Sequence, residues 1–403
     1  MKLTRKITED IIYVGGEDRK INLFEHHIPI RKGVTYNSYL ILDEKTALMD
    51  TADQDISRQF IENVEGELKG KKLDYLIIHH REPDHCYNIN EILLRHPETK
   101  LVGNRKTFLF LHQFFPSLDT TGKEIVVKEG DVLNLGKHSL KFYRAPRVHW
   151  PEVRMSFEEK EGLLFTADAF GTFDTLDGRL YADEFDFDNE ILDSARKYYT
   201  NIVGKYGPSV LALFKKLPGD KVNRILPLHG PLYRTKETRG KRIEKYSLWA
   251  SYTPEKKGVR IYYSTRYGDN REAAEALAIK LNEKGIKNIH IFDVSEIDIP
   301  ERISKAFEYS NLVFIANTYN AGLFPEMENL INDLIHQNIQ KKTITLIQNG
   351  TWAPTATKVR KDKLSTVKTF QFTATEVTIK SALNEDTRKQ LDQVAEEIVL
   401  SRK

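Results

Sequence analysis

The residues best suited to chemistry in this chain gather in one short segment. His80, Glu82, Asp84 and His85 place two imidazoles and two carboxylates within six residues, directly after the apolar run 73–78. Imidazole nitrogen and carboxylate oxygen are both ligands of transition metals in proteins. The segment therefore predicts a metal site at the end of a strand.

Three further residues of the same chemical types follow other strand-like runs. His149 follows the run 141–146, Asp168 follows 163–167, and His229 ends the stretch that begins with 224–228. A carboxylate placed between strand ends can bridge two metal ions while imidazoles complete each coordination sphere. The four histidines and three carboxylates together predict a dinuclear site. The four positive charges of two ferrous ions would be neutralised there by the three carboxylates and one bridging hydroxide.

Each residue also has a simpler explanation, such as a packed histidine, a turn, a solvated carboxylate or a helix cap. These explanations leave the clustering at strand ends unaccounted for. Glu82 bears most on the choice of metal, because a histidine there would give the nitrogen-rich site of zinc hydrolases, whereas a carboxylate suits iron. His79 should point to the opposite face of its strand and have a supporting role. The pattern favours redox chemistry over hydrolysis.

The composition limits the remaining classes of function. A chain of 403 residues exceeds what one core usually serves, so two domains are expected. Its formal charge is +3, with no basic tract suited to nucleic acid and no apolar segment that would span a membrane. The only cysteine, Cys86, cannot form a disulfide within the chain or a four-thiolate iron centre. We expect a soluble, cytoplasmic protein.

A polar stretch that contains Pro254 and Gly258 predicts a boundary between domains at 1–252 and 253–403. The first domain reads as short strands with helices packed outside them. In the second, strand-like runs at 259–263, 289–293, 312–316 and 343–348 alternate with helical ones from about Arg271 and Pro325. This alternation predicts a parallel, doubly wound sheet, and hence an α/β domain after a mixed α+β one.

Three loops at the carboxyl ends of these strands carry residues suited to a flavin. The first has hydroxyl and amide donors before a helix, which suits a phosphate monoester, and it lacks the glycine patterns of triphosphate and dinucleotide sites. Tyr319 and Trp352 could sandwich an aromatic ring; the alternative explanation is that both aromatic side chains only cover the sheet edge. The predicted flavin contacts are Thr265, Arg266, Tyr267, Gly268, Asp269, Asn270, Thr318, Tyr319, Asn320, Gly322, Asn349, Gly350, Thr351, Trp352 and Ala353.

With these motifs the chain resembles the flavodiiron proteins, in which a metallo-β-lactamase-like αββα sandwich precedes a flavodoxin-like domain. The resemblance covers essentially the whole chain. Its most specific segments are 80–85, 148–151, 164–171 and 227–230, with further similarity at 33–39 and 198–202.

The resemblance implies a site and an activity. One iron would be held by His80, Glu82 and His149, the other by Asp84, His85 and His229, with Asp168 bridging them and FMN in the second domain. Family members reduce dioxygen to water, nitric oxide to nitrous oxide, or both. They usually form head-to-tail homodimers or dimers of dimers, so that the flavin of one chain serves the irons of the other.

The chain departs from the usual family pattern at Cys86-Tyr87 after the first motif, at Asn317 before the second flavin loop, and at Asn270 in the phosphate loop. No ligand is lost. Tyr36, His26 and Cys86 are candidate groups for proton delivery.

Two other hypotheses stay open on the sequence alone. One is a zinc hydrolase fused to a flavodoxin-like domain, and the other is an electron-transfer module with a structural metal site. The expected electron donor is a separate carrier such as a rubredoxin. The sequence does not separate dioxygen from nitric oxide as substrate.

Overall fold

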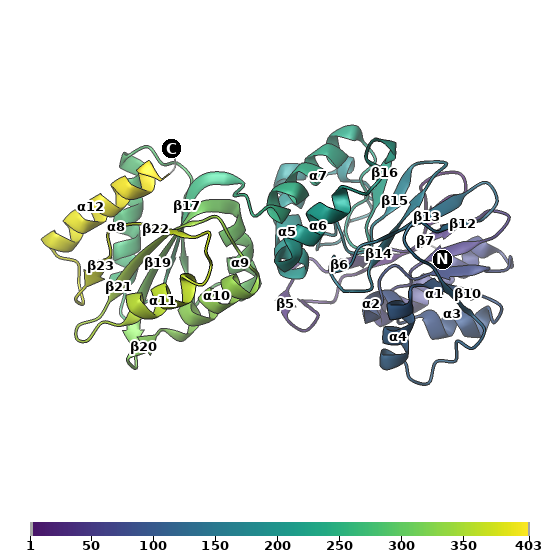
Figure 1. Ribbon diagram of the computed structural model, residues 1–403, viewed down its shortest axis with the longest axis horizontal. Coiled ribbons are helices and arrows are strands. Elements are labelled where there is room, and N and C mark those ends of the chain that lie inside the picture. The colour runs from purple at the N-terminus through teal and green to yellow at the C-terminus, as the bar shows by residue number, and fades with distance from the viewer. Residues whose placement is uncertain (1–2, 402–403) are drawn as a thin grey trace. The chain divides into compact units, whose positions relative to one another are not determined.

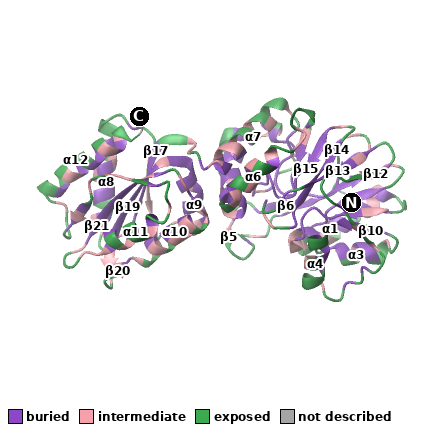
Figure 2. Cartoon of the chain, viewed as in Figure 1, coloured by how far each residue is buried: buried purple, intermediate pink, exposed green. Residues whose placement is uncertain are grey.

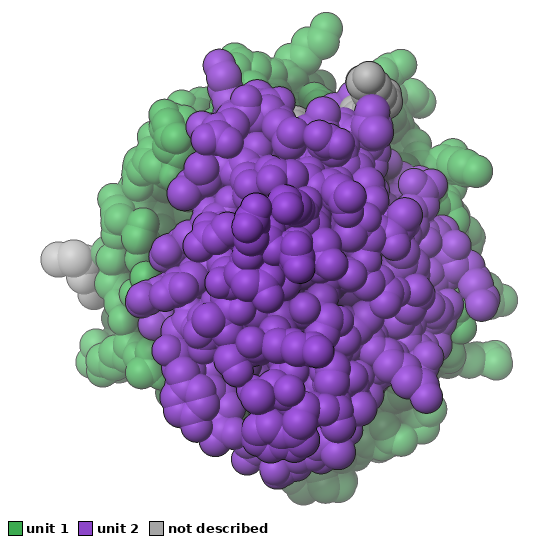
Figure 3. All heavy atoms as spheres, turned by 90° about the vertical axis from the view of Figure 1, so that its left-hand side faces the viewer, with its two compact units in different colours: residues 1–247 green, residues 248–403 purple. Residues whose placement is uncertain are grey.

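The computed structural model describes residues 3–401, and the chain divides into two compact units, unit 1 (Met1–Ser247) and unit 2 (Leu248–Lys403). Figure 1 labels their elements, and Figure 3 colours the atoms of the two units separately. Within residues 3–401, no helix combines the length and apolar character needed to cross a bilayer.

Unit 1 contains two large sheets. The first has the order β1 (Arg5–Lys6), β2 (Ile11–Tyr13), β7 (Tyr39–Ile41), β8 (Ala47–Met49), β9 (Tyr75–Ile77), β10 (Lys100–Gly103) and β11 (Glu124–Val126), and is parallel from β8 onward. The second has the order β12 (Val132–Asn134), β13 (Ser139–Arg144), β14 (Arg154–Glu158), β15 (Leu163–Phe165) and β16 (Arg224–Leu226). Two small ribbons pair β3 (Gly16–Asp18) with β6 (Val34–Tyr36) and β4 (Leu23–Phe24) with β5 (Ile28–Pro29).

The helices of unit 1 flank these sheets. They are α1 (Ser57–Leu68), α2 (Pro83–Cys86), α3 (Ile89–Arg95), α4 (Arg105–Phe114), α5 (Leu192–Tyr198), α6 (Gly207–Phe214) and α7 (Lys236–Ala250). Short 3₁₀ turns lie at Gln54–Ile56, Ala182–Glu184, Gly204–Tyr206 and Gly219–Lys221, and π-helical turns at Phe187–Ile191 and Tyr199–Val203.

The core of unit 1 lies between its two sheets. Ile41 and Ile77 from the first sheet share one buried cluster with Phe142, Phe165 and Leu226 from the second, and no helical side chain belongs to that cluster. The strands are correspondingly buried in Figure 2. The helices must therefore lie on the outer faces, which confirms the αββα sandwich predicted from the sequence.

Unit 2 is built on a parallel sheet of order β18 (Ile289–Asp293), β17 (Lys256–Tyr263), β19 (Tyr309–Tyr319), β21 (Thr343–Asn349) and β22 (Gln371–Phe372). β20 (Gly322–Leu323) pairs with β19, and β23 (Val377–Ile379) pairs with β21. Figure 1 shows α8 (Asp269–Glu283) and α12 (Glu385–Leu400) on one face, and α9 (Ile299–Glu308), α10 (Pro325–His336) and α11 (Ala356–Leu364) on the other. This is the predicted doubly wound sheet.

The strand predicted at 312–316 is longer in the structure. β19 continues to Tyr319 because Thr318 and Tyr319 pair with β20 across a tight turn. The turn residues Asn320 and Ala321 have φ of 49° and 59°, as a two-residue hairpin turn of this kind requires. The second predicted flavin loop is therefore a β-hairpin.

Candidate metal centre and cofactor pocket

The predicted metal ligands lie at one edge of the two sheets of unit 1, five in loops and two on the short helix α2. His80 and Glu82 follow β9, Asp168 follows β15 and His229 follows β16. His149 lies in the loop between β13 and β14. Asp84 and His85 belong to α2, where Pro83 occupies the first helical position, as proline often does.

The first group consists of His80, Glu82, His149 and Asp168, whose ligand atoms all lie within 4.8 Å of one another. Glu82 Oε2 is 3.0 Å from His80 Nε2 and 3.2 Å from His149 Nε2. Asp168 Oδ2 is 3.0 Å from His149 Nε2 and 3.5 Å from His80 Nε2. Two carboxylates and two imidazoles thus converge on one point.

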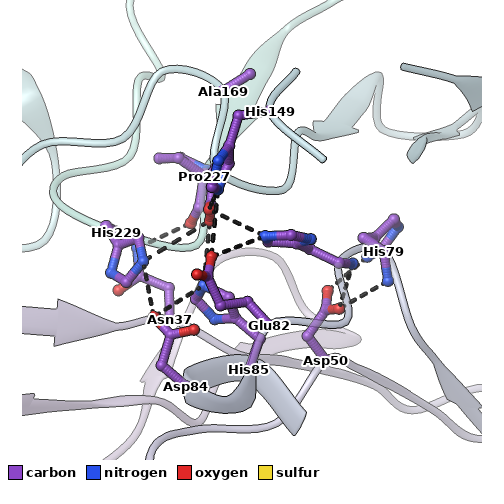
Figure 4. Close-up of polar contacts among 12 residues, drawn as sticks. Asn37, Asp50, His79, Glu82, Asp84, His85, His149, Ala169, Pro227 and His229 are labelled. Carbon is purple, nitrogen blue, oxygen red and sulfur yellow. Dashed lines mark hydrogen bonds and ion pairs between the residues drawn. The ribbon is translucent and has the colours of Figure 1, made fainter. Parts of the chain in front are cut away.

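The second group consists of Asp84, His85 and His229. Asp84 Oδ2 lies 3.4 Å from both His85 Nε2 and His229 Nε2. The other carboxylate oxygen of Asp168, Oδ1, lies 3.1 Å from His85 Nε2 and 3.7 Å from His229 Nε2. Asp168 therefore faces both groups, one oxygen to each. Figure 4 shows the labelled ligands Glu82, Asp84, His85, His149 and His229 around the same point.

Many buried polar atoms of this cluster have no hydrogen-bond partner among the described residues, as is expected of ligands that bind metal ions. Both oxygens of Asp84, Oδ1 of Asp168, both ring nitrogens of His85 and Nε2 of His229 are buried and make no hydrogen bond among the described residues. Leaving so many buried polar atoms unpaired costs about 1–3 kcal/mol each. Two divalent cations would satisfy the atoms of this set that face the centre, such as His85 Nε2 and His229 Nε2, whereas His85 Nδ1 lies on the other side of its ring.

The carboxylates also perturb the imidazoles. Burial alone lowers the pKa of His85, but Asp84 and Asp168 outweigh it and raise the pKa to about 9. For His149 the same opposition, with Asp168 and Glu82 as the anions, also raises the pKa to about 9. The cluster therefore attracts positive charge, which protons or metal cations can provide.

Two outer contacts orient the ligating imidazoles, and neither was predicted. Glu152 Oε1 lies 2.8 Å from His80 Nδ1 and also accepts from the amide of Arg81 at 3.1 Å. His229 Nδ1 lies 2.7 Å from the carbonyl oxygen of Thr35. Such contacts fix the ring so that Nε2 faces the metal.

The loop that carries His229 is held by Asn37. The buried Nδ2 of Asn37 donates to the carbonyls of Pro227 and Gly230, at 2.9 Å each. Both side chain and loop appear in Figure 4. The segment 33–39, which the sequence analysis noted only for its similarity to the family, thus holds the loop that carries His229 in place.

His79 lies outside the ligand cluster, as its position on the strand predicted. Its Nδ1 is 2.6 Å from Asp50 Oδ2 and its Nε2 is 2.7 Å from Ser156 Oγ. Asp50, His79 and Ser156 are therefore hydrogen-bonded in the sequence acid, imidazole, hydroxyl, as in a nucleophilic triad. All three are at most 1% exposed, so a substrate has no access to them. Asp50 Oδ1 also accepts from the amides of His79 and His80, at 2.7 and 3.4 Å, so this arrangement braces the strand end.

A cavity of about 630 Å³ opens beside the centre, lined by the segments 20–26, 53–55 and 82–84 and by Tyr36. Two of the three candidate proton-delivery residues, Tyr36 and His26, line it. Cys86 does not line it. The Cys86 thiol is buried and donates to the carbonyl of His80 at 3.3 Å, and burial raises its pKa well above the usual range.

Tyr198, which was not predicted as a site residue, also reaches the centre. Its ring is 5.6 Å from that of His229, and its buried hydroxyl makes no hydrogen bond among the described residues. Burial, followed by the charge of Asp168, raises the pKa of Tyr198 well above its ordinary value. The hydroxyl therefore stays protonated and is available as a donor.

In unit 2, a cavity of about 400 Å³ lies at the carboxyl ends of β17, β19 and β21, where the flavin was predicted. Its lining residues are Arg266, Tyr267, Asp269, Asn317, Thr318, Tyr319, Asn320, Ala321, Asn349, Gly350, Thr351, Trp352, Ala353 and Ser381. The predicted contacts Thr265, Gly268, Asn270 and Gly322 are not in the lining, whereas Asn317, Ala321 and Ser381 line it without having been predicted.

Several polar side chains in this region shape the loops. Asn349 Nδ2 donates to the carbonyl of Ser381 at 2.8 Å, and Asn349 Oδ1 accepts from the Ser381 amide at 3.0 Å. Thr318 Oγ1 accepts from the amides of Thr355 and Ala356, at 2.9 and 3.3 Å. Thr265 Oγ1 accepts from the Gly268 amide at 3.0 Å. These bonds fix the rim of the cavity.

The rim and the floor of this cavity suit a flavin. Tyr267 and Trp352 are 85% and 81% exposed, so large aromatic surfaces stand ready to cover a planar ring. Arg266 lies 5.5 and 5.6 Å from the ring centres of Tyr267 and Tyr319. Ser264 Oγ is buried with no hydrogen bond among the described residues, at the end of the strand that leads into the predicted phosphate loop.

Comparisons with known proteins agree with this organisation. The ODP family beta lactamase matches residues 34–230, and a flavodoxin domain matches residues 260–395. A relative from Citrobacter koseri, the anaerobic nitric oxide reductase flavorubredoxin, is 29% identical over 367 residues, which cover 89% of this chain and 73% of the relative.

Solved structures extend the similarity to nearly the whole fold. The rubredoxin oxygen:oxidoreductase from Desulfovibrio gigas matches with a TM-score of 0.92 and 25% identity, over 99% of this chain and 98% of that one. The flavodiiron protein from Giardia intestinalis matches with a TM-score of 0.92 and 20% identity, over 100% and 98%.

The fold and the site define a two-domain oxidoreductase in which a β-lactamase-like metal domain is joined to a flavodoxin domain. Within this class, the two family models, the flavorubredoxin and the rubredoxin oxygen:oxidoreductase to which the chain is similar support a flavodiiron protein.

Proposed function

We propose that this protein is a flavodiiron reductase, which passes electrons from an external carrier through FMN to a diiron centre. The centre reduces dioxygen to water, nitric oxide to nitrous oxide, or both, and so removes these gases. The observation that carries the proposal is Asp168, whose two buried oxygens face two separate groups of imidazoles and carboxylates.

The ligand roles follow from this arrangement. His80, Glu82 and His149 would hold one iron, and Asp84, His85 and His229 the other, with Asp168 shared between them. The bound irons and flavin would supply binding of the diatomic gas and up to four electrons, the number that turns one dioxygen and four protons into two waters.

The remaining residues of the chain orient and shield the site. Glu152 and the Thr35 carbonyl fix two of the imidazoles, while Asn37 holds the loop of His229. Tyr198 offers a buried O–H beside the second group, and Tyr36 and His26 line the adjacent cavity through which solvent protons can arrive.

A zinc hydrolase is not favoured. Glu82 replaces the nitrogen ligand that a zinc hydrolase of this fold would use, and the attached flavodoxin domain has no role in hydrolysis. The relatives and solved structures compared above carry the names of oxidoreductases.

The names of the similar flavorubredoxin and of the similar rubredoxin oxygen:oxidoreductase both contain rubredoxin, which supports a small iron–sulfur carrier of this kind as the electron donor. We also propose a cytoplasmic protein that works as a head-to-tail homodimer or a dimer of such dimers, because the family that it resembles forms these assemblies.

The test combines composition with activity. Protein purified without added metal is expected to contain about two irons and one FMN per chain, and to consume dioxygen or nitric oxide at an electrode when a reduced rubredoxin is supplied. His80→Asn should lower the iron content and abolish consumption. His336→Asn, at a side chain that is 75% exposed, is the matched control and should change neither. Protein that holds iron and FMN but consumes neither gas would refute the proposal, as would zinc in place of iron.

A further inference from the structure

Two asparagines touch each other at the flavin cavity, and one of them, Asn317, lines it. Asn270, near the start of α8, donates from Nδ2 to Oδ1 of Asn317, at the end of β19, at 3.1 Å. The same Nδ2 donates to the carbonyl of Ser264 at 2.7 Å. The pair therefore links the start of α8 and the first residue of the phosphate loop to the last residues of β19.

The direction of these bonds fixes the orientation of both amides. The carbonyl of Ser264 can only accept, so the nitrogen of Asn270 must face it. That nitrogen carries two hydrogens, and the second one requires an acceptor on Asn317, which must be Oδ1. The assignment of oxygen and nitrogen in both side chains thus follows from a backbone carbonyl.

The nitrogen of Asn317 is consequently turned away from Asn270. Asn317 lines the flavin cavity and is only partly buried. Its Nδ2 makes no hydrogen bond to any residue in the described part of the chain. Asn270, in contrast, is 0% exposed and does not line the cavity.

We propose, building on the FMN site proposed above, that Asn270 is a positioning residue that presents Asn317 to the bound flavin as an N–H donor. The acceptors on the flavin ring are its carbonyl oxygens and unprotonated ring nitrogens. Reduction of the flavin increases the negative charge on these atoms, so a fixed N–H donor binds the reduced ring more tightly than the oxidised one. The Asn270–Asn317 pair thereby raises the reduction potential of FMN.

The size of the effect follows from one hydrogen bond. A donor that interacts more strongly with the reduced ring changes the ratio of the oxidised and reduced dissociation constants by about tenfold. A tenfold change in that ratio corresponds to about 30 mV for a two-electron couple. Asn317→Leu is therefore expected to lower the midpoint potential by about this amount, and Asn317→Asp by more, since it adds a negative charge.

The experiment is a reductive titration of the full-length holoprotein with a reference dye, following the flavin absorbance with FMN added to saturation. Asn270→Leu should lower the potential in the wild-type background and have no further effect in the Asn317→Leu background, because it acts only through Asn317. Asn282→Leu, an exposed asparagine at the far end of α8, is the matched control and should leave the potential unchanged.

Two results would overturn the proposal. One is an unchanged potential in Asn317→Leu, and the other is an equal shift from Asn270→Leu in both backgrounds. If either leucine variant fails to fold, Asn270→Thr keeps a side chain with a single donor, which cannot serve both acceptors, and should lower the potential in part. A wild-type protein that binds no FMN would instead refute the proposed function.

Discussion

Replacing Lys342 by methionine should change how the stability of unit 2 depends on pH. Lys342 is 3% exposed, and its Nζ donates to the carbonyls of Phe307 and Tyr309, at 2.9 and 2.7 Å. Burial lowers the pKa of Lys342 to about 7, although Glu255 and Glu308 oppose the shift. A lysine this deep in a fold is neutral through much of the alkaline range.

The sign follows from proton binding. Below pH 7 the amine is protonated in both the folded and the unfolded state, so burying the charge costs a constant free energy. Between pH 7 and about 10.4, the unfolded chain binds a proton that the folded chain does not, so the free energy of unfolding rises with pH. The limiting slope is about 1.4 kcal/mol per pH unit. From pH 7.5 to 9.5 the wild type should gain about 2 kcal/mol over Lys342→Met, which lacks this titration.

The assay is urea unfolding at pH 7.5, 8.5 and 9.5, followed by far-UV circular dichroism and by release of FMN, which reports unit 2. Lys341→Met, at the exposed neighbouring residue, is the control and should show no such divergence from the wild type. Other titrating groups are common to all three proteins and cancel in the differences. A stability difference between wild type and Lys342→Met that stays constant across this range would refute the reasoning.

Three further substitutions probe the two sites. Glu152→Gln removes the charge behind His80 and should weaken iron binding by about 10- to 100-fold in a chelator competition, whereas unchanged affinity would show that His80 needs no carboxylate partner. Asp168→Asn leaves a single acceptor oxygen between the two groups and should reduce the metal content to one iron per chain or fewer, so that two retained irons would argue against a shared carboxylate. Trp352→Ala removes an aromatic face that is 81% exposed and should raise the Kd for FMN, measured by quenching of flavin fluorescence, by about tenfold, while an unchanged Kd would place Trp352 outside the flavin contacts.

The ligand cluster was predictable because the constraint on it is local. His80, Asp168 and His229 each lie three residues beyond the last residue of a strand, namely β9, β15 and β16. Strand ends can be recognised from short apolar runs, and neighbouring strands bring their ends to one edge of a sheet. Residue type and position relative to the strand were therefore sufficient to place these three side chains.

The supports of the cluster were not predictable in the same way. Glu152 reaches His80 across 72 residues of sequence, and Asn37 reaches Pro227 across 190. Nothing in the local pattern of either residue distinguishes it from an ordinary acid or amide. Their roles depend on which loops the packing of the two sheets brings together.

In the phosphate loop, the sequence identified Asn270 as a hydrogen-bond donor but not the direction of its side chain. From its residue type, Asn270 was expected to donate to the flavin, but its amide nitrogen is used by the carbonyl of Ser264 and by Asn317. Buried backbone carbonyls are almost always hydrogen-bonded, and the Asn270 side chain donates the hydrogen bond to the carbonyl of Ser264. Side-chain direction in such loops is decided by backbone groups whose pairing the sequence does not reveal.

The charge balance of the metal centre also involves Arg81, which lies between the ligands His80 and Glu82 in the sequence. Two divalent cations carry four positive charges, which Glu82, Asp84 and Asp168 together with the buried Glu152 would neutralise. Arg81 adds one positive charge to this sum. Its guanidinium is 0% exposed and makes no hydrogen bond among the described residues, so no direct hydrogen-bonding partner offsets that charge.

The Arg81 guanidinium instead lies 3.6 Å above the ring of Phe114, in a cation–π contact. A centre with Arg81 beside it therefore has capacity for one further negative charge, which an anionic species at the centre could supply without leaving the buried site unbalanced. Arg81, between the ligands His80 and Glu82, takes part in the charge balance of the buried centre, because the charges of Glu152, Glu82 and Asp84 act on its guanidinium.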